Sequence, residues 1–87
     1  MSDGIHKTAG GNYVKLMSTT EMSKIGVMAM DGDVYTVILN KDILKITMSN
    51  VRTGKKITVL KNSKLYGFLC TLLDSVGTNS VAIRVRA

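Results

Sequence analysis

Positively charged side chains alternate with β-branched ones in residues 80–86 (SVAIRVR) of this sequence. Because the side chains of a β-strand alternate between its two faces, the valines and the isoleucine would enter a core. Arg84 and Arg86 would then share the opposite, outward face. Contacts to phosphate require cations and hydrogen-bond donors but no fixed spacing. The chemistry that this segment predicts is therefore the binding of a polyanion.

Two earlier segments repeat this pattern with lysine and threonine. Lys45 shares an alternating face with Thr47, and Lys56 shares one with Thr58. Threonine hydroxyls could donate hydrogen bonds to phosphate oxygens beside the lysines. A small sheet with an apolar inner face and a basic, hydroxyl-rich outer face is the surface that these segments predict.

Aromatic side chains could add base stacking, as they do in proteins that bind single strands. Tyr13 stands close to Lys15 and is the best stacking candidate, whereas Tyr35 and Phe68 lie in apolar segments and are expected in the core. The predicted nucleic-acid-binding residues are Lys7, Tyr13, Lys15, Lys45, Arg52, Lys55, Lys56, Arg84 and Arg86.

Residues suited to catalysis or metal binding are few. His6 is the only histidine and Cys70 the only cysteine, so neither a catalytic pair nor a cysteine–histidine metal site can be assembled. The Asp-Gly-Asp sequence at 31–33 resembles the start of a calcium loop but lacks its later ligands. We expect no enzyme activity, no catalytic residues, no metal and no cofactor.

Composition and charge restrict the class of protein. The chain has 87 residues, with 12 Lys and Arg against 6 Asp and Glu, a net charge of +6, and 45% hydrophobic residues. This excess of positive charge favours a nucleic-acid partner over an incidental solvated surface. The longest apolar stretch, 65–73, is about half the roughly 18 residues of a membrane helix, so no membrane partner is expected. The single cysteine and the absence of a signal-like segment predict a cytoplasmic protein, in the host cytoplasm if it is viral.

The elements that would position these residues form an α+β fold. Alternation and turn residues predict an antiparallel β-meander of four to five strands, then one helix and a C-terminal strand. The expected strands are 13–17, 24–30, 34–39, 43–51, 55–60 and 80–86, and the expected helix is 63–76. Ser18 and Glu21 have the spacing of a capping box, but Gly26 and its β-branched neighbours argue for a strand there. Residues 1–12 are expected to be a flexible arm, and residues 13–87 a single nucleic-acid-binding domain.

The expected helix has a broad apolar stripe, made of Leu65, Phe68, Leu69, Leu72, Leu73 and Val76. One small sheet would not easily cover such a stripe, and leftover apolar surface usually marks an interface. We therefore expect a homo-oligomer, a dimer or tetramer, formed through this helix or through an exposed strand edge.

The order of these elements resembles a known family. The strands VYTVILN, ILKITMSNV and KKITVL, followed by KNSK and the helix LYGFLCTLLDSV, are similar to the transcriptional-coactivator and Whirly type of single-stranded DNA-binding domain. In that type a curved sheet precedes a dimerising helix. The last strand, SVAIRVRA, departs from the pattern. Size and composition also resemble small bacteriophage single-stranded DNA-binding proteins, including those that assist a phage RNA polymerase.

The residues and the resemblance together predict a small protein that binds single-stranded DNA without sequence specificity, with RNA as another ligand. It would serve as an accessory factor in transcription or replication, with an RNA polymerase as a further partner. Two other classes stay open. One is a protein-interaction module, for example a viral polymerase-binding regulator that uses its helix or the methionines of residues 22–30. The other is a structural oligomer subunit whose charge is incidental.

Overall fold

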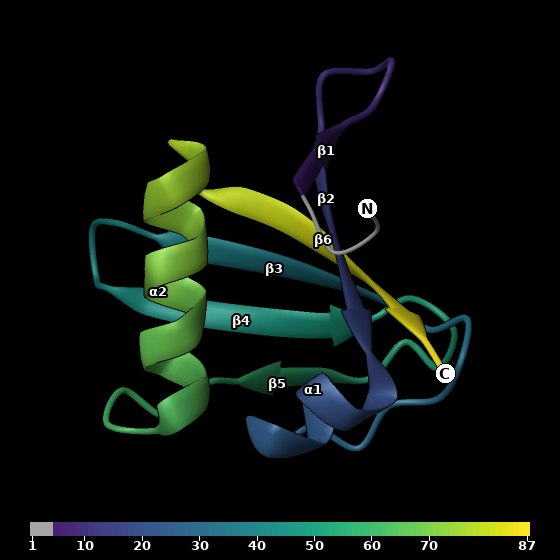
Figure 1. The fold of residues 1–87 in the computed structure, drawn as a ribbon. Coiled ribbons are helices and arrows are strands. Elements are labelled where there is room, and N and C mark those ends of the chain that lie inside the picture. The colour runs from purple at the N-terminus through teal and green to yellow at the C-terminus, as the bar shows by residue number, and fades with distance from the viewer. Residues whose placement is uncertain (1–4) are drawn as a thin grey trace.

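Six strands form one sheet in the order β1-β2-β6-β3-β4-β5, and two helices accompany it (Figure 1). The structure is a computed structural model and describes residues 5–87. The strands are β1 (Ile5–Lys7), β2 (Tyr13–Ser18), β3 (Val34–Asn40), β4 (Lys45–Asn50), β5 (Lys56–Thr58) and β6 (Ser80–Arg86). The helices are α1 (Thr19–Lys24) and α2 (Lys64–Val76). The fold is thus α+β, as the sequence predicted.

The sheet is mixed rather than purely antiparallel. Strands β3, β4 and β5 form an antiparallel meander of three strands, shorter than the four to five predicted. Strand β6 returns from α2 and lies between β2 and β3, parallel to β2 and antiparallel to β3. Strand β3 therefore has a neighbour on each side, which agrees with the continuous apolar character of its sequence.

The segment after β2 differs from the prediction in two ways: a short helix, α1, follows β2 directly, and the expected strand 24–30 is a loop. The Ser18 hydroxyl accepts from Glu21 N at 3.0 Å, and the Glu21 carboxylate accepts from Ser18 N at 3.0 Å, so the capping box is formed. Met22 is fully buried by this turn of helix. Residues 25–33 continue as a loop that buries Val27. The capping box and the burial of Met22 stabilise α1, while Val27 is buried from the loop, so the β-propensity of residues 25–27 did not produce a strand.

Helix α2 has the predicted boundaries and caps. The Ser63 hydroxyl accepts from Tyr66 N at 3.1 Å, and Gly77 closes the helix in the left-handed conformation with a φ of 78°. Leu65, Leu69, Leu72 and Leu73 are buried against the sheet. Phe68 and Val76 are partly buried against the same core. The expectation that the sheet would leave this stripe uncovered is therefore wrong, because the inner face of the sheet accommodates it.

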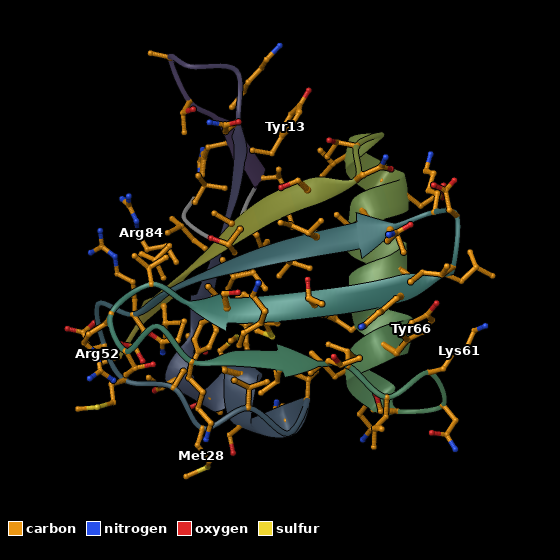
Figure 2. The ribbon with its side chains drawn as sticks, turned by 180° about the vertical axis from the view of Figure 1, so that it is seen from behind. Tyr13, Met28, Arg52, Lys61, Tyr66 and Arg84 are labelled. Atoms are coloured by element: carbon orange, nitrogen blue, oxygen red, sulfur yellow. The ribbon has the colours of Figure 1, made fainter. Side chains whose placement is uncertain are left out.

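The two faces of the sheet differ in what covers them. The inner face carries the core residues of the strands and both helices pack on it (Figure 1). The opposite face carries no helix, as the view from behind shows (Figure 2). We call it the open face. From the strand pairing, its central residues are Val34, Thr36, Ile38, Lys45, Thr47, Ser49, Lys56, Thr58, Ser80, Ala82, Arg84 and Arg86.

The N-terminal segment is more ordered than a flexible arm. Strand β1 pairs antiparallel with β2, with Ile5 opposite Lys15 and Lys7 opposite Tyr13. The connecting turn is closed by Thr8 N, which donates to Asn12 O at 2.7 Å. Residues 5–12 therefore form a hairpin with β2, which differs from the predicted arm. The remainder of that predicted arm, residues 1–4, lies outside the described residues.

Candidate nucleic-acid interface

Four of the predicted cations share the open face, with Arg84 and Arg86 near the beginning of β3 and Lys45 near its end. Arg84 is in register with Val34, and Lys45 with Asn40, so their side chains share the outward direction of those positions. Lys56 is opposite Ser49 on β4, and Arg86 lies two residues beyond Arg84 on β6. All four are exposed. The sequence-based prediction of a shared face for Lys45, Lys56, Arg84 and Arg86 is confirmed.

Hydroxyl groups and small side chains occupy the space between these cations. One row across the sheet runs from Ala82 through Thr36 and Ser49 to Lys56. The next row runs from Ser80 through Ile38 and Thr47 to Thr58. Neighbouring strands are about 4.8 Å apart, so each row presents closely spaced side chains. The open face can therefore offer hydrogen-bond donors along a path between the arginines and the lysines.

The four cations are not neutralised within the described chain. Among residues 5–87 the ion pair closer than 4.0 Å joins Arg52 and Asp33, and it involves none of them. No outward strand position of the open face carries an aspartate or glutamate. The carboxylate of Asp31, in the loop before β3, lies near the arginines and lines a hollow with Arg84 and Arg86.

Tyr13 shares the side of β2 that carries Lys15 and Met17 and packs partly against the core, and it also lines a shallow hollow at the end of the sheet. The hollow is about 240 Å³ and is lined by Tyr13 with Thr36, Ser80 and Ala82 of the open face, together with Asn12 and Val81. The Lys7 ammonium lies 5.8 Å from the centre of the Tyr13 ring, within the range of a cation–π contact. The structure thus brings Lys7 and Tyr13 together next to the open face.

Arg52 has a different environment from the other predicted cations. Its Nε donates to Asp33 Oδ1 at 2.7 Å. Asp33 is buried and also accepts from Met30 N at 3.0 Å and from the Asn50 amide at 3.3 Å. The Arg52 hydrogen bond, followed by that from Met30, lowers the pKa of Asp33 from 3.8 to about 2. The Arg52 guanidinium is therefore engaged in the fold, although its side chain is 56% exposed.

Lys15 and Lys55 do not join the open face. Lys15 is in register with Ile83, whose side chain is in the core, so it is directed to the helix-bearing side of β2. Lys55 is exposed in the loop between β4 and β5, where its backbone N donates to the Thr53 hydroxyl at 3.2 Å. The nine predicted residues thus divide into an open-face group, a Lys7–Tyr13 pair, and three cations placed elsewhere.

The sequence reasoning missed two features. The first is that Asp33 anchors both the loop that precedes β3 and the loop that follows β4. An aspartate directly before the most apolar strand was the available signal. The second feature is a groove of about 400 Å³ bordered by Met28, Met30 and Ile57. Two loops, strands β3, β4 and β5, and helix α2 all contribute to its lining, so no single stretch of sequence indicated it.

Within residues 5–87, no three histidine, cysteine, aspartate or glutamate side chains gather in a way that could hold a metal ion. His6 is exposed on β1, and Cys70 is a free, partly buried thiol on α2. None of the helices in this part of the chain combines the length and apolar character needed to cross a membrane.

Comparison with known proteins identifies no relative: no protein-family model, no curated protein and no solved structure matches this chain.

Proposed function

We propose that this protein binds single-stranded nucleic acid, DNA in the first place, without sequence specificity and through the open face. The observation that carries the proposal is the sharing of one uncovered sheet face by Lys45, Lys56, Arg84 and Arg86, with no carboxylate at the outward strand positions between them. Such a surface attracts a phosphate backbone by charge, and its hydroxyls can position that backbone through hydrogen bonds.

The position of the helices supports a single strand as the ligand. Proteins that read duplex DNA commonly place a helix in the major groove. Here α1 and α2 pack on the inner face, opposite the cations (Figures 1 and 2). A strand whose bases are unpaired could lie along the open face and place a base in the hollow at the end of the sheet, which Tyr13 lines.

The proposed role is that of a cytoplasmic, non-enzymatic accessory factor in transcription or replication. By binding a single strand without sequence specificity, the protein would protect DNA whose duplex another enzyme, such as an RNA polymerase, has opened, or would make that strand accessible to the enzyme. A phosphate-dominated contact suits this role, because it does not select sequences.

A charge-matched pair of double variants tests the proposal. Arg84→Ala with Arg86→Ala removes two cations from the open face, whereas Lys24→Ala with Lys64→Ala removes two exposed cations from the helices. Affinity for a labelled single-stranded oligonucleotide is measured by fluorescence anisotropy. We expect only the arginine variant to lose affinity and to reduce the salt-dependence slope by about 1.4, which is about 0.7 per lost phosphate contact.

Both variants should remain folded, since exposed charges contribute little to stability. Equal losses in the two variants would mean that net charge alone attracts DNA, and no binding by the native protein at low salt would refute the proposal. Duplex DNA and RNA of equal length complete the comparison and test the preference for a single DNA strand.

A further inference from the structure

An apolar groove lies on the inner side of the sheet, at the end away from β1. It has a volume of about 400 Å³, within the range of ligand pockets. The loop of residues 26–30 forms one wall, and Met48, Ile57 and Leu65 contribute from the sheet and α2. Met28 is 90% exposed and Met30 63% exposed at its border. Flexible methionine side chains at such a border suit the binding of another apolar side chain.

The groove is continuous with a free strand edge. Strand β5 is the last strand of the sheet on this side, and its middle residue, Ile57, lines the groove. Asn50 N donates to Lys55 O at 2.9 Å, and Val59 N donates to Ile46 O at 2.9 Å. The backbone groups of residues 55, 57 and 59 therefore face β4. Because these groups alternate along a strand, those of Lys56 and Thr58 face the free edge.

An added strand would have a defined arrangement of side chains. The residue placed beside Ile57 would point to the inner side, over the groove, because neighbouring residues in a sheet share a face. The residues before and after it would lie beside Lys56 and Thr58, on the open-face side. This edge therefore selects a segment whose apolar residues alternate with polar ones.

Charge determines which polar residues fit. Arg52 and Lys55 line the groove, and Lys56 lies next to it on β5. The one carboxylate in the lining, Asp33, is buried and paired with Arg52. A second copy of this chain would bring a net charge of +6 and its own Lys56 to the same edge, and like charges placed opposite each other destabilise strand pairing.

We infer that the β5 edge and the adjoining groove bind an extended segment of a partner protein, in which acidic residues alternate with apolar ones. The segment adds a strand to β5, the mode known as β-augmentation. Its backbone bonds to Lys56 and Thr58, one apolar side chain enters the groove between Met28 and Ile57, and its carboxylates lie on the open-face side, beside Lys56 and Thr58. This site is distinct from the arginine end of the open face, and the inference does not depend on nucleic-acid binding.

Synthetic peptides test the inference on the native protein. The probe is a short fluorescent peptide in which valine alternates with glutamate, and its affinity is measured by anisotropy. The first control replaces each glutamate by lysine. The second methylates the backbone nitrogens that would face β5. We expect the acidic peptide to bind, the lysine peptide not to bind, and the methylated peptide to bind about tenfold more weakly, since it loses backbone hydrogen bonds.

Two variants at one position complete the test. Thr58→Pro removes an N–H that faces the free edge, a position where proline is compatible with an edge strand. Thr58→Val changes the side chain and keeps that N–H. Peptide affinity should fall about tenfold in Thr58→Pro and be retained in Thr58→Val.

Several outcomes would overturn the inference. They are no binding of the acidic peptide, equal binding of the lysine or methylated peptide, or equal affinity for both Thr58 variants while both are folded. Self-association that only Thr58→Pro abolishes would assign the edge to a second copy instead. Protection of the β5 amides from exchange by a single-stranded oligonucleotide, and not by the peptide, would assign it to nucleic acid.

Discussion

At the scale of single residues, Asp33 has the most connections in the described chain outside the regular ladders. Its carboxylate holds the loop of Met30, the amide of Asn50 and the guanidinium of Arg52. Asn50 in turn accepts from the backbone of Arg52 and Thr53 at 2.8 and 3.1 Å. Two loops that are far apart in the sequence are thereby joined at one buried charge, and both loops border the apolar groove.

The first prediction concerns this charge. The pKa of Asp33 is about 2 in the folded protein, against an ordinary 3.8, so the ionised form stabilises the fold above pH ~4. That contribution is lost as the pH falls from about 4 toward 2. We expect Asp33→Asn to be less stable than the native protein near pH 6 and the difference to vanish near pH 2. Urea unfolding at both pH values measures this, and a difference that does not change with pH would contradict it.

The second prediction concerns Tyr13. If a base stacks on its ring, Tyr13→Ala should weaken single-strand binding by about tenfold, and Tyr13→Phe should retain affinity because the ring is kept. An abasic oligonucleotide is the matched ligand, since it keeps the phosphates and removes the bases. Anisotropy should show no effect of Tyr13→Ala on that ligand. An equal loss with both ligands would instead assign the effect to the Lys7–Tyr13 hairpin.

At the scale of elements, the ends of α2 are set by its capping residues, Ser63 and Gly77. The Ser63 hydroxyl accepts from Tyr66 N and donates to Leu60 O at 2.7 Å, which fixes the turn before the helix. The Tyr66 hydroxyl donates to Leu44 O at 3.2 Å, so the same end of the helix is joined to the β3–β4 turn. The helix terminus therefore positions the turn from which Lys45 enters the open face.

The third prediction follows from this cap. Ser63→Ala should reduce the free energy of unfolding by about 1 kcal/mol, because Tyr66 N loses its partner. Asn62→Ala, at the preceding exposed position, is the control and should change stability by less than about 0.5 kcal/mol. Chemical denaturation of both variants measures the difference. Equal stability of the two would show that the cap contributes nothing to the fold.

Sequence patterns predicted the elements whose signals are local. Alternation located β3, β4, β5 and β6, and Ser63 with Gly77 bounded α2 closely. The pairing of β6 with β2 could not be predicted, because no local pattern specifies a partner strand about 65 residues earlier. The loop of residues 25–33 was misassigned because Val27 is buried through tertiary contacts without being in a strand. In the candidate site, strand alternation was enough to predict the residues of the open face. The groove could not be predicted, because the misassigned loop forms one of its walls.

At the scale of the whole molecule, charge and apolar surface are separated. The cations of the open face lie on one side of the sheet, and the exposed Met28 and Met30 border the groove formed on the other. One expected oligomer interface was the apolar stripe of α2. Because the sheet buries most of that stripe, the helix no longer offers the exposed apolar surface from which we predicted assembly. Homo-oligomerisation through a strand edge stays a prediction, which light scattering at high protein concentration can check.

The fourth prediction concerns the response of the whole surface to salt. With four open-face cations each contacting a phosphate, the logarithm of the single-strand binding constant should fall with the logarithm of salt concentration with a slope of about −3. Titrations at several ionic strengths measure the slope. A slope near zero would mean that the open face does not bind the backbone, and one far steeper would mean that cations beyond these four take part.

The central position of β6 has a consequence for how the chain folds. It is the last element of the described sequence, and it pairs with both β2 and β3 over five registers each. Until it has been synthesised, β2 can pair only with β1 and β3 only with β4, so one edge of each strand is open. The sheet can therefore close only after translation has passed residue 86. Folding is then paced by contacts between distant parts of the chain, and a truncated or stalled product exposes a strand edge that favours aggregation.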